Sequence, residues 1–366
     1  MLADRVRTFA YAEALRRTVA PDAVVLDIGT GTGVWALLAC RLGARRVYAV
    51  EAGPIIHLAE QLAAANVCAD RITFIRALST EITLPEPADI VVSDIHGVLP
   101  FLGGGLEALI DARRHLRHGA AMIPREDTTW AAVVEAETVY TDYVGGWSDI
   151  CGADLSTGRM MALNSTRKVR VERAALLTPP HAWHAIDYRT LASPHASAEF
   201  TTTIERPGTA HGLALWFDSV LADGIALSNA PGGDALIYGQ LFFPWQEPIA
   251  VSRGDRVTVG LRAALVGREY IWTWTCSVLD GENGIKAAFH QSTFNSQLLS
   301  HERLERESPA AIPGRAGVAA TAFIVDAVDG RATVAEIAGR LRSAFPNRFA
   351  TDRSAIAFIR DVLYPG

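Results

Sequence analysis

The feature that most constrains this chain is a short strand followed by a glycine-rich turn and a helix near the N-terminus. Residues 24–26 form an apolar run, and residues 34–42 carry apolar side chains at helical spacing. Between them, Gly29, Gly31 and Gly33 allow the backbone to turn sharply and to approach a ligand where a Cβ would collide. The free N–H groups at the start of the following helix favour an anion. This segment therefore predicts a ligand-binding α/β sheet.

The second predicted strand, residues 46–50, ends at Glu51, whose carboxylate can accept hydrogen bonds from both hydroxyls of a ribose. A dinucleotide loop requires a third small residue for close packing, and Val34 occupies that place. Asp27 followed by the three glycines instead gives the loop typical of S-adenosylmethionine (SAM) enzymes. We therefore predict SAM as the cofactor, with a nicotinamide dinucleotide as the alternative.

The composition excludes several classes of protein. The chain has 366 residues, of which 49% are hydrophobic, and a net charge of −6, which indicates a globular protein of two or three domains without the basic excess of a nucleic-acid partner. Its four cysteines have no paired or metal-type spacing, so we expect a reducing compartment and no metal site. Neither a signal peptide nor a membrane span is evident. By elimination we expect a cytoplasmic protein without a membrane partner.

Three regions follow one another along the chain. Residues 1–125 alternate strands and helices, which predicts a doubly wound, Rossmann-like parallel sheet that binds SAM. Residues 126–303 alternate apolar and polar side chains with period two, which predicts a mostly antiparallel β-barrel or sandwich for the substrate. Within the first region we expect strands at 24–27, 46–51, 72–76, 90–93 and 121–123 and a helix at 106–116.

Two further segments break these patterns. Residues 142–168, rich in glycine and aromatic side chains and poor in either period, predict an extended arm. The charged segment rich in Pro, Gly and Ala at 301–317 predicts a linker. The third region, taken as residues 304–366, holds most of this linker and a small helical domain. There, a first helix stops at Gly330, Thr333 caps a second, and residues 354–363 form a third.

The segments MLADRVRTFAY, VVLDIGTGTG, GARRVYAVE and ADIVVSDIHG resemble the protein arginine methyltransferase family, in register over roughly the first 300 residues. RRHLRHGAAMIPREDTTWAAVVEAE and YGQLFFPWQEPIAVSRGDRVTVGL are similar to the crossover and late barrel strands of that family. The resemblance implies a SAM-dependent methyltransferase that forms a homodimer through its arm. Tyr143, Trp147, Met160 and Met161 would lie at that interface, although an arm packed on its own barrel explains them as well.

The same resemblance assigns cofactor contacts. Arg7 would bind the carboxylate of SAM with two parallel hydrogen bonds, the alternative being a surface ion pair with Asp4. Gly29 and Gly31 would approach the methionine part, and Glu51 the ribose.

At the adenine end the chain departs from the family. Thr80 stands where the family usually has a carboxylate for the adenine amino group, and Glu81 comes one residue later. The family's helix that folds over the cofactor precedes the MLxDxVRT segment, with which this chain begins. We therefore expect the lid to be missing or supplied by another element.

Arginine methylation requires paired glutamates in one loop, and here Asp94 and Gly103 occupy their positions. The guanidinium clamp is therefore predicted to be lost, unless Glu107 reaches back to replace the missing acid. The alternative for Glu107 is a side chain on a solvated helix face. The family's Thr-His-Trp segment aligns with residues 236–238, which places Tyr238 at the wall of a less polar acceptor pocket.

The loop after the fourth strand should hold the methyl acceptor. Asp94 could anchor or deprotonate it, and His96 could act as the base because histidine titrates near working pH. A hydrogen-bonded loop histidine is the equal alternative, and a carboxyl acceptor would need no base.

Residues 319–363 are similar to the small PqqD-type domains that bind leader peptides of ribosomally made natural products, although a structural or dimerisation domain would also fit. The sequence thus predicts a SAM-dependent enzyme that N- or O-methylates a peptide, such as a natural-product precursor, or a small molecule. The alternatives are a silent SAM-fold scaffold and a divergent arginine N-methyltransferase.

Overall fold

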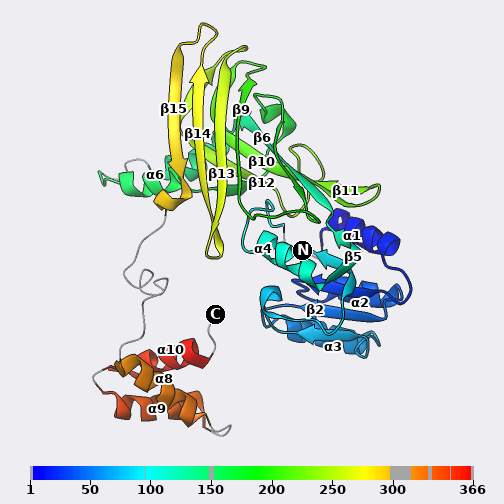
Figure 1. Ribbon diagram of the computed structural model, residues 1–366. Helices are drawn as coiled ribbons and strands as arrows, with labels where there is room; N and C mark the ends of the chain where they lie inside the picture. The colour runs from blue at the N-terminus through cyan, green and yellow to red at the C-terminus, as the bar shows by residue number, and fades with distance from the viewer. Residues whose placement is uncertain are drawn as a thin grey trace. The chain divides into compact units, whose positions relative to one another are not determined.

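The structure, a computed structural model, describes residues 3–94, 96–147, 152–296, 315–328, 332–346 and 348–363. The chain divides into two compact units, Met1–Gln297 and Leu298–Gly366, which are described separately below. Figure 1 shows the first unit as a parallel sheet with helices, followed along the chain by long antiparallel strands.

The N-terminal part of the first unit is the predicted parallel sheet. Its strand order is β3-β2-β1-β4-β5, so the order reverses between β1 and β4, next to the glycine loop. All five residues of β1 are buried, as expected for a strand covered on both faces. The strands are β1 (Val24–Ile28), β2 (Arg46–Val50), β3 (Ile72–Ile75), β4 (Ala88–Ser93) and β5 (Leu116–Ile123), and the helices are α1 (Arg5–Thr18), α2 (Val34–Arg41), α3 (Ile56–Ala65) and α4 (Gly105–Ala112), with 3-10 turns η1 (Ser79–Glu81) and η2 (Arg113–His115).

One boundary in this sheet differs from the prediction. The helix expected to reach Leu116 ends at Ala112, and β5 begins at Leu116 rather than at Ala121. The first residues of β5 are exposed at the edge of the sheet, where Arg117 forms an ion pair with Asp89. A search for apolar runs misses such a polar edge segment.

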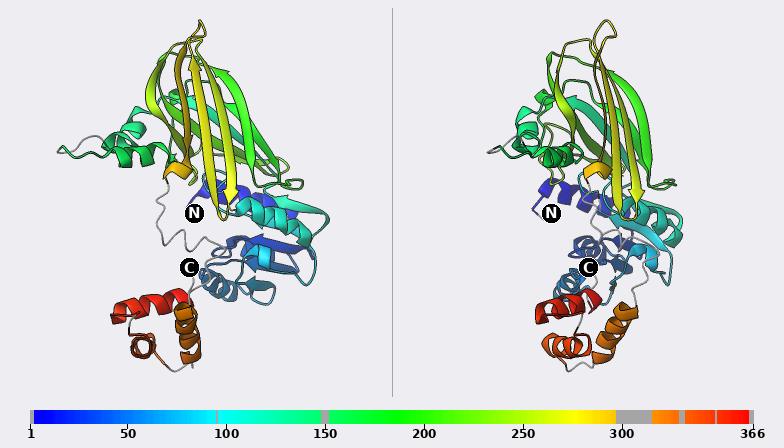
Figure 2. Two further views of the ribbon diagram at one scale, coloured as in Figure 1. Left: turned by 60° about the vertical axis from the view of Figure 1, so that its left-hand side comes forward. Right: turned by 90° about the vertical axis from the view of Figure 1, so that its left-hand side faces the viewer.

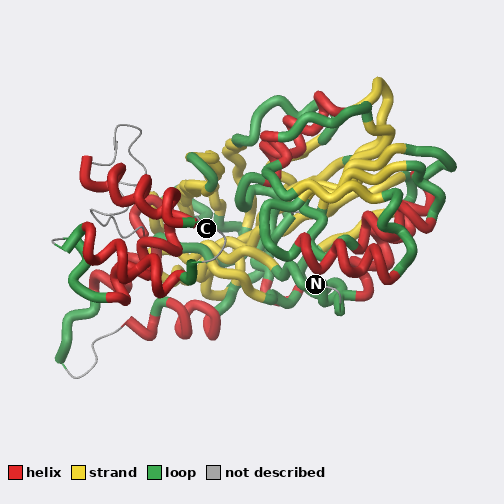
Figure 3. The backbone as a smooth tube through the Cα atoms, turned by 90° about the horizontal axis from the view of Figure 1, so that it is seen from below, coloured by secondary structure: helices red, strands yellow, loops and turns green. Residues whose placement is uncertain are grey.

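The second part of the first unit consists of two antiparallel sheets, whose strands run alongside one another in Figure 3. Figure 2 shows the two sheets facing each other. Phe243 of one sheet contacts Trp272 and Trp274 of the other edge-on, each at 5.1 Å between ring centroids. One sheet has the order β7 (Arg167–Val169), β12 (Gln240–Val251), β10 (Gly208–Ala222), β6 (Glu126–Val134), β8 (His181–Asp187), with β11 (Ile225–Ser228) on β10; the other has the order β15 (Ile285–Ser292), β14 (Glu269–Leu279), β13 (Arg256–Val266), β9 (Ala196–Thr203).

The predicted barrel is not closed among the described strands, since no ladder joins the two sheets. At the β15 edge the reason is visible. The Ser292 N–H donates to the side-chain oxygen of Asn164, and the Gln291 amide donates to the carbonyl of Leu163. Residues from the end of α6 (Ser156–Leu163) thus lie against this edge, where Asn164 occupies the backbone N–H of Ser292 and Leu163 accepts from the Gln291 side chain.

The predicted arm is largely helical rather than extended. It contains α5 (Glu137–Tyr143), a 3-10 turn η3 (Gly145–Trp147) and α6, while residues 148–151 lie outside the described part. Trp147 and Met160 are exposed, whereas Tyr143 is half-buried under the guanidinium of Arg167. Tyr140, Val144, Ala162 and Leu163 pack against Phe242 of β12, so the arm has its own apolar core.

The described part of the second unit is a set of three helices, α8 (Arg315–Ala327), α9 (Val334–Ala344) and α10 (Asp352–Leu363). Thr333 and Glu336 form a reciprocal capping box, which confirms the predicted helix start. The predicted linker, apart from residues 315–317, which belong to α8, and the expected stop at Gly330 lie outside the described residues. No helix in the described ranges is long and apolar enough to cross a membrane.

Candidate functional site

The glycine loop follows β1 and is shaped by Asp27. This carboxylate is fully buried and accepts hydrogen bonds from the Thr30 hydroxyl at 2.5 Å and from the Ala36 N–H at 3.1 Å. Burial raises the pKa of Asp27 to about 7. Gly33 has a φ of +78°, and a Cβ there would come within 2.9 Å of the Ala59 side chain. Asp27 therefore organises the loop from beneath and does not line a pocket.

Glu51, directly after β2, faces the same loop. Its two carboxylate oxygens accept hydrogen bonds from the Gly31 N–H at 3.1 Å and from the Gly53 N–H at 2.8 Å. These bonds fix the carboxylate at the carboxyl end of the sheet, beside the point where the strand order reverses. This is where an open α/β sheet binds its ligand.

A pocket of about 370 Å³ opens at this edge. Its volume lies within the range of ordinary small-molecule sites. Asp27, Gly33 and Glu81 are not among its lining residues. The lining comprises loop and strand ends (Ile28, Gly29, Val50, Glu51, Ala52), the η1 region (Ala77, Leu78, Ser79, Thr80), the residues around the start of α4 (Leu102, Gly104, Gly105, Glu107, Ala108) and Arg268 from the β13–β14 turn.

A second group of predicted residues meets beside the loop after β4. Arg7 of α1 is 2% exposed, and its guanidinium forms an ion pair with Asp94. The other oxygen of Asp94 accepts a hydrogen bond from the Tyr238 hydroxyl at 2.5 Å. Burial raises the pKa of Tyr238 well above its usual range, so this hydroxyl remains a donor. Asp4 caps α1 through the Arg7 N–H instead of forming the surface ion pair considered above.

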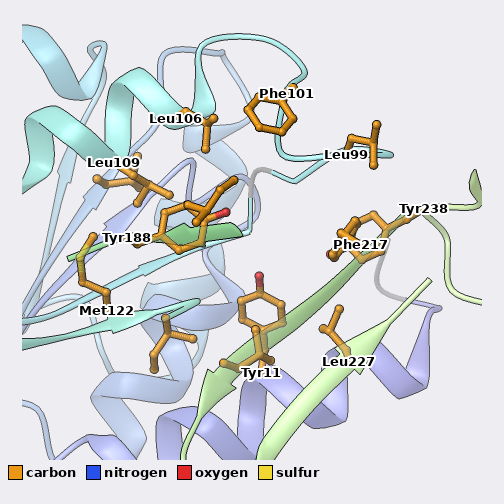
Figure 4. Packing of buried hydrophobic residues seen from close by; sticks show 14 of the residues in the cluster. Tyr11, Leu99, Phe101, Leu106, Leu109, Met122, Tyr188, Phe217, Leu227 and Tyr238 are labelled. Carbon is orange, nitrogen blue, oxygen red and sulfur yellow. The ribbon is translucent and has the colours of Figure 1, made fainter. Parts of the chain in front are cut away.

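His96 lies in a separate buried network. Its Nε2 is 2.8 Å from an oxygen of Asp127, and its Nδ1 is 3.3 Å from the Tyr11 hydroxyl. The Tyr188 hydroxyl also donates to Asp127, and the His96 ring stacks on Phe217 with centroids 4.8 Å apart. Figure 4 shows the two tyrosines on either side of this region. Both ring nitrogens have partners and the residue is 3% exposed, so this geometry favours a structural histidine over a base that meets the acceptor.

The loop between β4 and α4 is anchored to the antiparallel sheets by Phe101. This buried ring, labelled in Figure 4, contacts Trp272 edge-on at 5.9 Å between ring centroids. It also packs near Trp183. The glycines that follow are open, because a Cβ at Gly103 or at Gly104 would meet nothing within 4 Å. Gly103, the position predicted to correspond to the family's second glutamate, thus faces open space and has a φ of +64°.

Sequence reasoning assigned no role to Asp127 or to Arg268, and it placed Glu107 near a guanidinium clamp rather than in the pocket. Asp127 follows the cis-proline crossover in an ordinary alternating strand, and Arg268 is one charge in a tight turn. Neither position carries a motif. Glu107 carried a usable signal, since it falls in the first turn of a helix that starts beside the sheet edge.

The fold and pocket define a nucleoside-binding α/β domain joined to an antiparallel substrate domain, and comparison with known proteins identifies the group. Residues 8–102 match the family described as ribosomal protein L11 methyltransferase, and residues 126–265 match the arginine methyltransferase oligomerization subdomain.

Among characterised relatives, protein arginine N-methyltransferase 1 of Schizosaccharomyces pombe is 30% identical over 266 residues, covering 70% of this chain and 78% of that protein. A probable histone-arginine methyltransferase CARM1 of Oryza sativa subsp. indica is 32% identical over 280 residues, covering 70% of this chain and 52% of that protein. The chain belongs to the protein arginine methyltransferase family of SAM-dependent enzymes.

Solved structures agree on the fold. The Trypanosoma brucei PRMT1 enzyme-prozyme complex with AdoHcy gives a TM-score of 0.72 at 24% identity, covering 80% of this chain and 95% of that one. Arabidopsis thaliana protein arginine methyltransferase 10, solved in an open conformation, gives 0.70 at 23% identity with the same coverage. The parallel sheet followed by antiparallel sheets is therefore the architecture of this family.

Proposed function

We propose that this chain binds SAM in the pocket at the edge of the parallel sheet and transfers its methyl group to a peptide acceptor. The residues present fit such a ligand. Glu51 lines the pocket with an anchored carboxylate that can accept the two ribose hydroxyls, and Gly29 presents bare backbone next to it. SAM, when bound, supplies a methyl group on a positively charged sulfur.

Arg7 is the proposed partner of the cofactor's carboxylate. Its guanidinium is buried, held beside the glycine loop by α1, and packed 5.6 Å from the Trp35 ring centroid. The guanidinium has several donors in a fixed plane, so it can keep Asp94 while it binds a second carboxylate. Arg7 would thus tie the cofactor to the acceptor loop.

The acceptor, we propose, is not a clamped guanidinium. The observation that carries this proposal is that Arg7 already balances the charge of Asp94, while Gly103 supplies no second carboxylate. An amine, hydroxyl or carboxyl group on a peptide needs no paired carboxylates. Asp94 would orient such an acceptor or take its proton, and Tyr238 would hold Asp94 in place.

The C-terminal helices are the proposed binding element for a leader segment of that peptide, as their resemblance to PqqD-type domains suggests. The capped α9 and the amphipathic α10 support a folded three-helix unit with its own apolar core. The arm is proposed to join two copies of the chain, because Trp147 and Met160 are large apolar side chains left exposed on it.

Arginine N-methylation is the second candidate, and the names of the relatives favour it. Their curated activities concern arginine, and Glu107 is the acidic side chain of α4 nearest the glycine triplet. This alternative requires Glu107 or a partner subunit to replace the missing glutamate.

Product analysis separates these candidates. The full chain would be incubated with SAM carrying a heavy methyl group and with candidate peptides, with and without a leader segment, and the products fragmented in a mass spectrometer. A methyl group on a backbone or side-chain amine, hydroxyl or carboxyl supports the proposal, and a base-labile product marks an ester. Methylarginine would refute the acceptor assignment, and an unchanged KM without the leader would refute leader recognition.

Calorimetry with S-adenosylhomocysteine provides the test that does not depend on the acceptor. A chain that fails to bind this ligand in the micromolar range would be a scaffold, not an enzyme.

A further inference from the structure

No carboxylate of η1 lines the proposed adenine end of the pocket, since Thr80 stands there, where the resemblance places an acidic side chain. Glu81 is exposed and does not line the pocket. A different carboxylate, Glu107, does line it. It comes from α4, on the other side of the pocket from the glycine loop.

The structure holds α4 and η1 together. Arg114, just beyond α4, donates hydrogen bonds to the carbonyl oxygens of Thr80 at 3.3 Å and Ile82 at 2.6 Å. These bonds tie the end of α4 to η1, and the first turn of α4 lines the same pocket as Ser79 and Thr80. Gly105 and Ala108, which also line the pocket, are small and leave room for a flat ring between the two elements.

Arg268 closes the same pocket from the antiparallel domain. It stands in the tight turn between β13 and β14, where Gly267 has a φ of +62°. The pKa of Tyr270, two residues further, is raised by burial and then by the charge of Glu107, so this turn lies close to Glu107. Arg268 is the residue of the antiparallel sheets that reaches this pocket among those described.

We propose that Glu107 accepts the hydrogen bond of the exocyclic amine of adenine, in place of a carboxylate from η1, and that Arg268 covers the adenine ring. This inference rests on the proposed SAM site. A carboxylate reads an amine donor and rejects a carbonyl acceptor at the same position. A guanidinium stacks on a flat aromatic ring while its polar edge stays in water. The adenine specificity of the site would then come from an α4 side chain and a turn of the substrate domain.

The test compares two ligands by calorimetry: S-adenosylhomocysteine and its analogue with inosine in place of adenosine, which presents a carbonyl oxygen instead of the amine. The wild-type chain should prefer the adenosine ligand by at least about tenfold, the effect of one hydrogen bond to a charged group. Glu107→Gln should lower that preference by about tenfold or reverse it, because the new amide can donate to the carbonyl. Arg268→Ala should weaken both ligands by a similar factor.

Glu81→Gln is the matched control. It makes the same chemical change on η1, at a side chain that does not line the pocket, and should leave the preference for the adenosine ligand unchanged. A Glu107→Gln variant with the wild-type preference would overturn the inference while leaving the SAM site intact, and so would a loss of preference in Glu81→Gln alone. A wild-type chain that binds neither ligand would refute the SAM site itself. Melting temperatures of the variants verify folding, which the exposed position of Glu107 should not affect.

Discussion

The ion pair of Arg7 with Asp94 links the proposed cofactor site to the proposed acceptor site, and Asp94→Asn tests both links. The substitution keeps the shape of the side chain but removes its charge from beside a buried guanidinium. The two side chains are 3% and 5% exposed, so solvent does not screen the loss. Breaking a pair buried to this degree destabilises a protein by about 3–5 kcal/mol.

That loss should lower the melting temperature by roughly 6–20 °C, given about 2–4 °C per kcal/mol for a large domain. Glu86→Gln is the control, because its pair with Arg45 is exposed and worth at most about 1 kcal/mol. Differential scanning calorimetry of the three full-length proteins gives the comparison.

S-adenosylhomocysteine provides the second measurement. If its carboxylate binds Arg7, it restores a negative charge beside the guanidinium, and the variant gains more from the ligand than the wild type does. The ligand-induced rise in melting temperature should therefore be larger in Asp94→Asn than in the wild type. A destabilisation no larger than that of Glu86→Gln would refute the buried pair. Equal ligand-induced rises would refute the role of Arg7 in cofactor binding.

Three further outcomes follow from the structure. Gly103→Glu places its Cβ in open space, although the positive φ costs about 1 kcal/mol. This variant should form more methylarginine than Gly103→Ala does. Mass spectra without any gain would argue against a lost clamp. The pKa of Asp27 is about 7 in the folded chain and 3.8 when unfolded, so ionisation of Asp27 lowers the free energy of unfolding as the pH rises from about 4 to 7. Across that range the melting temperature should fall more in the wild type than in Asp27→Asn. Met160→Glu on the arm should convert the proposed dimer into monomers in light scattering, and a variant that keeps the mass of a wild-type dimer would exclude this face.

The parts of the site that the sequence predicted are those set by neighbouring residues. The strand, glycine turn and helix form a continuous segment, and Glu51 follows from the position at which the next strand ends. The apolar runs were sufficient for the parallel sheet because both of its faces are covered. The helix start at Thr333 was equally local, since a capping box needs only Thr333 and Glu336.

The rest depends on contacts between distant segments. Tyr238 reaches Asp94 across the interface of the parallel and antiparallel sheets, and Asp127 and Tyr11 hold His96 from two other elements. A histidine two residues from a predicted acceptor site looks catalytic until both of its nitrogens have named partners. The prediction of a closed barrel was wrong for a similar reason, since the groups of Asn164 and Leu163 that accept hydrogen bonds at the β15 edge belong to the arm.

Charge balance supports the proposal that the loop after β4 takes a neutral or acidic acceptor. Paired glutamates around an arginine substrate offer two negative charges to one positive charge, whereas Asp94 offers one negative charge that Arg7 already balances. With SAM bound, its sulfonium and ammonium groups outnumber its single carboxylate, so this buried corner carries a net positive charge before any acceptor enters. A guanidinium would then bring an uncompensated charge into a site where Asp94 and Arg7 are almost inaccessible to water. An amine that arrives deprotonated, a hydroxyl, or a carboxylate near Arg7 avoids that penalty, and each of them leaves the hydrogen bond from Tyr238 to Asp94 in place.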